Sequence, residues 1–177
     1  MRIQLEVPTA KREAEFIAAT RRSRRFFSGF VRPPSSSADY REYVKRCRTS
    51  SCEGRLVVSR ESNELLGVVN VNEIIRRSFQ SGLLGYYAFS PHGGHGYMRE
   101  ALHALVTQAF GSFSLHRLEA NIQPQNKKSI ALVRSLGFRL EGFSPRYLKV
   151  AGRWCDHERW ALLAEDRKKR KGASGDS

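Results

Sequence analysis

The chain has 177 residues, of which 40% are hydrophobic and 27% charged, which is typical of one soluble globular domain. No apolar run approaches the ~20 residues of a membrane span, and the three cysteines show no metal-ligand spacing, so both a membrane protein and a metal site are disfavoured. The net charge of +14 favours a polyanionic partner.

The first part of the chain is predicted to hold one strand and two helices. Alternating apolar residues in 1–7 indicate a strand and not a signal peptide, which together with odd, reduced cysteines predicts a cytoplasmic protein. Residues 10–20 and 38–48 are predicted to be helical. We expect the inward-facing residues of the first helix to be Ala14, Ile17 and Ala18.

Positive charge is concentrated in the N-terminal third. Residues 1–60 carry 14 basic and 6 acidic side chains, and the densest run lies in the predicted loop between the two helices. Such a surface favours a polyanionic partner, such as ribosomal RNA, through counterion release. A basic face that is merely solvated is the alternative. The arginines of this run are Arg21, Arg22, Arg24 and Arg25.

The middle of the chain predicts three strands and a glycine-rich turn. The strands are expected at 56–58, 65–71 and 83–89, and a helix with one apolar face follows at 98–110. Between the last strand and this helix stand Gly93, Gly94 and Gly96. A strand, a glycine turn and a helix N-terminus together suit a phosphate. A turn that simply tolerates glycine is the other interpretation.

The last part predicts a strand at 117–123, a helix from the Asn126 cap to residue 136, and a hairpin of residues 139–150 and 153–163. The whole order predicts an α/β fold, a mixed sheet with helices on both faces. We therefore expect one domain over residues 1–163. The basic tail, residues 164–177, is expected to be disordered.

Two stretches resemble a known family. Residues 93–98 are similar to the acetyl-CoA-binding motif of the GNAT acetyltransferases, with Gly93 where the family carries Arg or Gln and Met98 where it carries a small residue. Residues 121–138 resemble the family's second landmark, an Asn and then a helix that ends in Leu-Gly-Phe. Residues 152–157 resemble the RimJ/RimL branch, whose named members acetylate N-termini of ribosomal proteins. The likeness covers about residues 55–163.

The resemblance implies the GNAT fold, a mostly antiparallel sheet of about seven strands in which two strands splay apart. It also implies acetyl-CoA as co-substrate and no metal. The pantetheine arm would lie in the gap, and a backbone N–H near Ala88 or Phe89 would polarise the thioester carbonyl. The cofactor-binding residues implied are Tyr87, Ala88, Phe89, Gly93, Gly94, His95, Gly96, Tyr97, Met98, Asn126 and Ser129.

The acid and base depart from the family pattern. Asn121 stands where many members have a glutamate, and Val133 stands where they have a tyrosine that protonates the CoA thiolate. Ser129 is the predicted partner of the leaving sulfur, although a solvent-facing helix serine is the alternative. For the base we consider Glu73 or a water held by Asn121.

The resulting hypothesis is an N-acetyltransferase that moves the acetyl group of acetyl-CoA to a primary amine by direct attack in a ternary complex. A protein N-terminus, such as that of a ribosomal protein, is the expected acceptor. One alternative acceptor is a small-molecule amine or amino sugar. A second alternative is a binding module that contacts ribosomal RNA and has lost catalysis.

Overall fold

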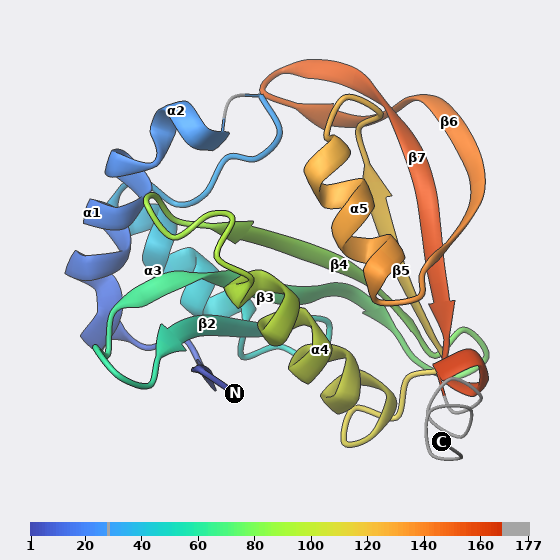
Figure 1. The fold of residues 1–177 in the computed structure, drawn as a ribbon, viewed down its shortest axis with the longest axis horizontal. Helices are drawn as coiled ribbons and strands as arrows, with labels where there is room; N and C mark the ends of the chain where they lie inside the picture. The colour runs from blue at the N-terminus through green and yellow to red at the C-terminus, as the bar shows by residue number, and fades with distance from the viewer. Residues whose placement is uncertain (28, 168–177) are drawn as a thin grey trace.

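The structure, a computed structural model, describes residues 1–27 and 29–167. Its centre is a seven-stranded sheet in the order β1-β2-β3-β4-β5-β7-β6, in which only β4 and β5 are parallel (Figure 1). The predicted, mostly antiparallel sheet is confirmed. The strands are β1 (Ile3–Glu6), β2 (Glu53–Ser59), β3 (Leu65–Ile75), β4 (Ser81–Ala88), β5 (Arg117–Ile122), β6 (Arg139–Val150) and β7 (Arg153–Leu163).

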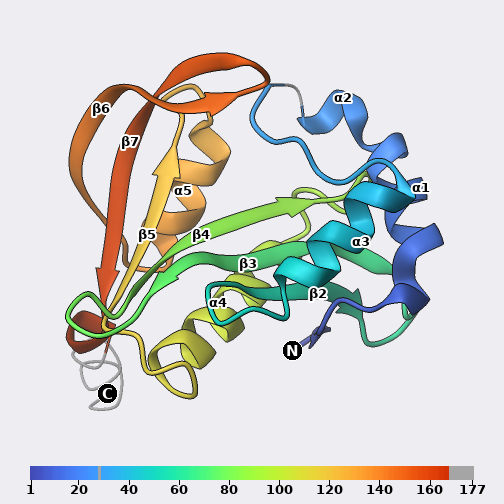
Figure 2. The same cartoon turned by 180° about the vertical axis from the view of Figure 1, so that it is seen from behind.

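Helices cover both faces of the sheet. In Figure 1 α4 and α5 lie in front of the strands, and the reverse view in Figure 2 shows α3 against the other face, with α1 and α2 near the end of β4. The helices are the 3-10 turn η1 (Ala10–Arg12), α1 (Glu13–Arg22), α2 (Arg24–Phe27), α3 (Ser37–Arg46), α4 (Tyr97–Phe110) and α5 (Lys127–Ser135).

The larger core lies between the sheet and the two helices α4 and α5. The buried face of α4 has the predicted helical spacing, from Ala101 through Leu105 to Ala109. In β5 the buried residues alternate as expected, with Leu118 and Ala120 packed in the same core. Burial of these two periodic faces fixes the directions of α4 and β5, which border the site described below.

The second core lies between the opposite sheet face and helices α1 and α3, and it is rich in aromatic rings. Phe16 is fully buried there, and its ring lies 4.7 Å from that of Tyr40 and 5.4 Å from that of Phe89. The prediction that Ala14 and Ala18 face inward is wrong, because both are exposed. The α-helix begins only after the 3-10 turn, which shifts its phase so that the large Phe16 side chain faces the core.

The predicted loop at residues 21–25 is in part helical. α1 continues to Arg22, Ser23 is fully buried with its Oγ donating to the Ala19 carbonyl at 2.7 Å, and the short α2 follows. This buried hydrogen bond stabilises the junction between α1 and α2. All four arginines of the basic run are exposed on α1 and α2.

Beyond β7, residues 164–167 form a helical turn, and the N–H of Ala164 donates to the His116 carbonyl at 3.0 Å. The rest of the predicted tail, residues 168–177, lies outside the described residues. Among the helices of residues 1–27 and 29–167, none has the length and apolar character needed to cross a membrane.

Candidate active site

β4 and β5 separate along their length and leave a gap in the sheet. They pair only from Ser81 to Leu83, against Arg117 to Glu119. β4 then stays paired with β3 as far as Ala88, whereas β5 follows β7 away from it (Figure 1). One edge of β4 is therefore unpaired inside the sheet, and the expected splay of the two strands is confirmed.

The open edge of β4 presents the backbone of Ala88. Ala88 lies opposite Gly67, and the N–H of Phe89 donates to the Leu66 carbonyl at 2.8 Å. In an antiparallel ladder this pattern makes Ala88 and Gly67 a pair without hydrogen bonds between them, so the N–H of Ala88 points toward the gap. The expectation for Phe89 needs correction, because its N–H is already bonded and its ring is fully buried in the aromatic core.

The glycine turn leads directly into α4. Gly94 and Gly96 have φ values of 91° and 83°, a left-handed conformation that glycine adopts without strain. Gly96 is the N-cap of α4, and no side chain caps the helix there. The first-turn N–H groups and the positive end of the helix dipole are thus left for an anion.

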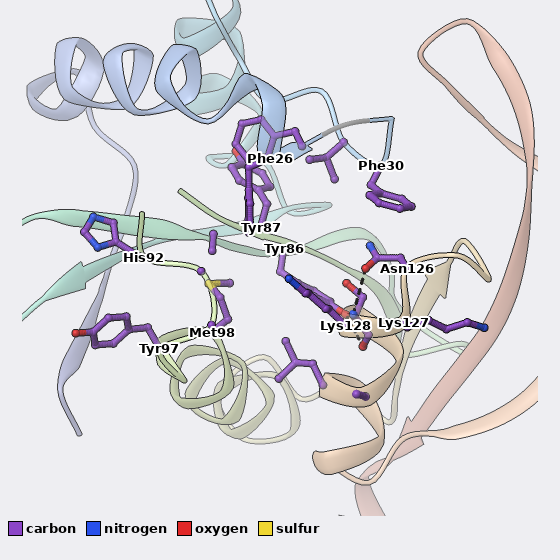
Figure 3. Close-up of a pocket in the computed structure, with 18 of the residues that line it drawn as sticks. Phe26, Phe30, Tyr86, Tyr87, His92, Tyr97, Met98, Asn126, Lys127 and Lys128 are labelled. Atoms are coloured by element: carbon purple, nitrogen blue, oxygen red, sulfur yellow. Dashed lines mark hydrogen bonds between the residues drawn. The ribbon is translucent and has the colours of Figure 1, made fainter. Parts of the chain in front are cut away.

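A cavity of about 1000 Å³ joins the gap to the glycine turn. In Figure 3 Met98 and Tyr86 lie at its centre, and Phe26 and Phe30 face α4 and α5 across it. Residues from α2, β4, the turn and the first turns of α4 and α5 line it: Arg25, Phe26, Phe27, Phe30, Val31, Tyr86, Tyr87, Ala88, His92, Gly93, Gly94, Gly96, Tyr97, Met98, Arg99, Gln125, Asn126, Lys127, Lys128, Ser129, Ala131 and Leu132.

Most of the predicted cofactor residues line this cavity, and two do not. Phe89 lies beneath it, as described above. His95 is exposed on the outer side of the turn, where its carbonyl accepts a hydrogen bond from the Arg2 guanidinium at 2.9 Å and its ring stacks on Tyr97 at 6.1 Å. Arg2 also pairs with Glu100 of α4 at 2.6 Å, so the residue before β1 contacts both the turn and the first turn of α4 from outside.

The start of α5 forms the opposite wall. Asn126 caps the helix as predicted, with its Oδ1 accepting from the Ser129 N–H at 3.2 Å. Across the gap, the Tyr86 hydroxyl donates to the Ser129 carbonyl at 3.3 Å. Burial raises the pKa of Tyr86 to about 12, so this phenol keeps its proton at neutral pH. Val133 is fully buried one turn further along α5 and carries no proton to give.

Asn121 lies on β5, on the sheet face opposite the α4–α5 core, and is not among the residues that line the cavity. Its Oδ1 is buried and has no hydrogen-bond partner within the part of the chain that the structure describes. An unpaired buried acceptor carries a free-energy cost that a water or a ligand N–H removes. The neighbouring Gln123 donates to the Gly29 carbonyl at 3.2 Å, so the loop after α2 reaches the end of β5.

Glu73 is not brought to the other predicted residues. It is exposed at the far end of β3, in the irregular stretch where the register with β4 shifts between Asn72 and Ile75. Ile75 pairs with Ser81, seven residues along β4 from Ala88, a distance of roughly 20 Å at about 3.3 Å per residue. In this bulge Glu73 has a φ of 47°. We therefore do not retain it as a candidate base.

Sequence reasoning missed the contribution of α2. The aromatics after the basic run were expected to pin a loop onto the core or to stack on bases, and instead Phe26, Phe27 and Phe30 form a wall of the cavity. Three phenylalanines within residues 26–30 were the sequence signal that could have indicated this wall. No cluster of three or more metal-binding side chains occurs in residues 1–27 or 29–167.

Comparison with known proteins agrees with this geometry. A family model described as an acetyltransferase (GNAT) domain matches residues 2–139. Over 106 residues the chain is 38% identical to the ribosomal protein uS5-alanine N-acetyltransferase of Escherichia coli, a match that covers 60% of this chain and 55% of that protein. The chain thus spans a little over half the length of that relative.

Two further similarities cover nearly the whole chain. The spermidine N(1)-acetyltransferase of Vibrio cholerae is 27% identical over 169 residues, which is 92% of this chain and 95% of that protein. The structure of RimJ from Mycobacterium smegmatis in complex with CoA-disulfide superposes with a TM-score of 0.86 at 23% identity and covers 98% of this chain and 89% of that one. At 23% identity, the similarity to this RimJ structure shows a shared fold alone.

Proposed function

Since the chain belongs to the GNAT acetyltransferase family, we propose that it moves the acetyl group of acetyl-CoA to a primary amine, in particular the N-terminal amine of a protein such as a ribosomal protein. The observation that carries the proposal is the continuous cavity from the uncapped N-terminus of α4 to the open edge of β4. It suits a long ligand with phosphate at one end and a carbonyl group at the other.

The fit to acetyl-CoA rests on donors of two kinds. The backbone of Gly94, Gly96 and the first turn of α4 suits the diphosphate, and the N–H of Ala88 suits the thioester carbonyl oxygen, on which negative charge develops during attack. Asn126 has a side-chain N–H₂ left over from its capping role to meet the pantetheine arm. The role of acetyl-CoA is to supply the activated acetyl group.

In the transfer, the amine lone pair forms a bond to the carbonyl carbon and the carbon–sulfur bond breaks. The amine loses one proton and the leaving sulfur takes up one. Ser129, which lines the cavity one turn before Val133, is the proposed hydrogen-bond donor to the sulfur. Asn121 is the proposed acceptor for the incoming amine or for a water beside it, because its buried Oδ1 needs a donor. An α-amino group has a pKa of about 8, so roughly a tenth of it is neutral at pH 7 without a strong base.

The acceptor is proposed from similarity. No acidic side chain is found among the described residues that line the cavity, whereas Arg25, Arg99, Lys127 and Lys128 do line it. These basic side chains suit the phosphates of acetyl-CoA, so the lining of this cavity does not discriminate between acceptors. The similarity to a uS5-alanine acetyltransferase favours a protein N-terminus. A small amine remains the second candidate because of the similarity to a spermidine acetyltransferase.

A polyanion near the acceptor is part of the same proposal. Arg21 and Arg24 are exposed on α1 and α2 and form no ion pair in the described structure. Ribosomal RNA beside a ribosomal protein would meet these side chains, and its contribution would fall steeply with added salt.

The test is free-thiol release from acetyl-CoA with three acceptors: peptides with free N-termini, the same peptides N-acetylated, and spermidine. We expect turnover with free N-termini alone, and mass spectrometry should place the acetyl group on the α-amine. Ser129→Ala should lower kcat about 10- to 100-fold with little change in acetyl-CoA affinity. Asn121→Ala should raise the peptide KM about tenfold. Preferred turnover of spermidine would reject the protein acceptor, and no binding of CoA would reject the proposed function.

A further inference from the structure

The N-terminal helices are bonded to the glycine turn, although about 67 residues separate them in sequence. The Arg22 Nε donates to the Ser90 carbonyl at 2.8 Å, and the Ser90 N–H donates to the Ser23 Oγ, also at 2.8 Å. Ser23 is fully buried. The junction of α1 and α2 is thus fixed against the start of the turn, and whatever α2 carries is held beside the glycines.

Phe26 occupies the space over Gly93. A Cβ at position 93 would lie 2.6 Å from the Cζ of Phe26, which is closer than real side chains approach. The turn therefore offers only backbone at position 93, and the side chains nearest that point come from α2. Phe26 and Gly93 both line the cavity.

Arg25 precedes Phe26 and lines the same cavity. It is exposed, and within residues 1–27 and 29–167 it makes no hydrogen bond and no ion pair. In this it differs from Arg22, which is held by the Ser90 carbonyl. A guanidinium without a partner, on a fixed element beside an uncapped helix N-terminus, has the geometry and charge to form paired hydrogen bonds to phosphate oxygens.

We propose that Arg25 binds the diphosphate of acetyl-CoA and so supplies, from α2, the side-chain charge that Gly93 lacks. This inference rests on the proposed function. It gives Arg25 a different role from the rest of the basic run. Arg25 binds acetyl-CoA, whereas Arg21 and Arg24 remain the surface arginines proposed to contact RNA. Arg99, Lys127 and Lys128 line the cavity as well and retain part of the phosphate affinity when Arg25 is replaced.

The test is titration calorimetry of the full chain with CoA and with 3′-dephospho-CoA, which lacks the 3′-phosphate and keeps the diphosphate. The variants are Arg25→Gln, Arg25→Lys and, as a matched control, Arg32→Gln, which removes an exposed arginine of the same segment that does not line the cavity. We expect Arg25→Gln to weaken both ligands about tenfold, Arg25→Lys to recover most of the loss, and Arg32→Gln to change neither.

The outcomes separate this inference from the proposed function. If the unaltered chain fails to bind CoA, the proposed function fails. If that chain binds and Arg25→Gln binds equally well, only the role of Arg25 fails. Loss with CoA alone would overturn the assignment to the diphosphate in favour of the 3′-phosphate. A loss that Arg25→Lys does not recover, with a lower melting temperature of the free protein, would show a structural role and also overturn the proposal.

Discussion

The hydroxyl of Tyr86 reaches from β4 across the gap and donates to the backbone carbonyl of Ser129 at the start of α5. The bond joins β4 to α5 inside the cavity, which both residues line. Its acceptor belongs to Ser129, the residue proposed to hydrogen-bond the leaving sulfur. A ligand arm that enters the gap passes beside this contact. The contribution of the Tyr86 hydrogen bond to stability should therefore differ between the free protein and the ligand-bound protein.

Tyr86→Phe removes this bond and leaves the ring in place. We expect the free energy of unfolding of the free protein to fall by about 1 kcal/mol, and its Tm by about 2–4 °C. With saturating CoA the difference should shrink, because the ligand then holds the two walls together. Thermal unfolding with and without CoA measures both effects, and an equal loss in the two states would contradict the second.

Gly93→Ala forces a Cβ into the ring of Phe26. Because Phe26 is 49% exposed, its ring has room to move outward. We therefore expect less than about 1 kcal/mol of lost stability but a severalfold weaker affinity for CoA as α2 shifts. The double variant with Phe26→Ala should recover the affinity, since the added methyl then has room. Calorimetry of the unaltered chain, the two single variants and the double variant gives the coupling between positions 93 and 26 in CoA affinity. Additive losses of affinity would contradict a role for the contact between these two residues.

Gly67→Ala has a larger predicted cost. Its Cβ would lie 2.6 Å from the Tyr87 carbonyl oxygen and 2.9 Å from the Met98 sulfur. A backbone oxygen in a central strand cannot move aside, so we expect a loss of about 2–3 kcal/mol in a urea titration. Gly152→Ala in the β6–β7 turn is the comparison, because open space surrounds that Cβ and only its φ of 84° opposes the change.

Arg117→Gln should alter stability in acid. Arg117 on β5 hydrogen-bonds Glu141 on β6, across β7, and this contact holds the pKa of Glu141 below its usual 4.5. A lowered pKa in the folded state means that the ionised carboxylate stabilises the fold above pH 4.5, and that this contribution is lost as pH falls through the folded pKa.

We therefore expect Arg117→Gln to be slightly less stable at pH 7, by under about 1 kcal/mol because Glu141 is 42% exposed, and to match the unaltered chain at the lowest pH. Denaturant titrations at several pH values compare the two proteins. A difference that grows toward acid would reverse the sign and reject the assignment.

Local rules predicted most of the fold, and contacts between distant residues decided the rest. Apolar spacing identified α4 and β5, and Asn126 was recognised as a cap, because those signals lie within a few residues of each other. The packing of Phe26 on Gly93 joins residues far apart in sequence, and no local pattern contains it. Glu73 was misplaced for a related reason, since a bulge shifts the register of β3 and no residue nearby marks it.

The short parallel pairing of β4 with β5 has a consequence for the width of the cavity. Within the sheet, three residue pairs join the four-stranded part, which packs on α4, to the three-stranded part, which packs on α5, and one core of buried side chains spans both parts. The width of the cavity then depends on how far β4 and β5 separate beyond Leu83 and Glu119, as well as on the residues that line it. A substitution in that shared core can therefore change the separation of β4 and β5, and with it the width of the cavity, without touching a residue that lines the cavity.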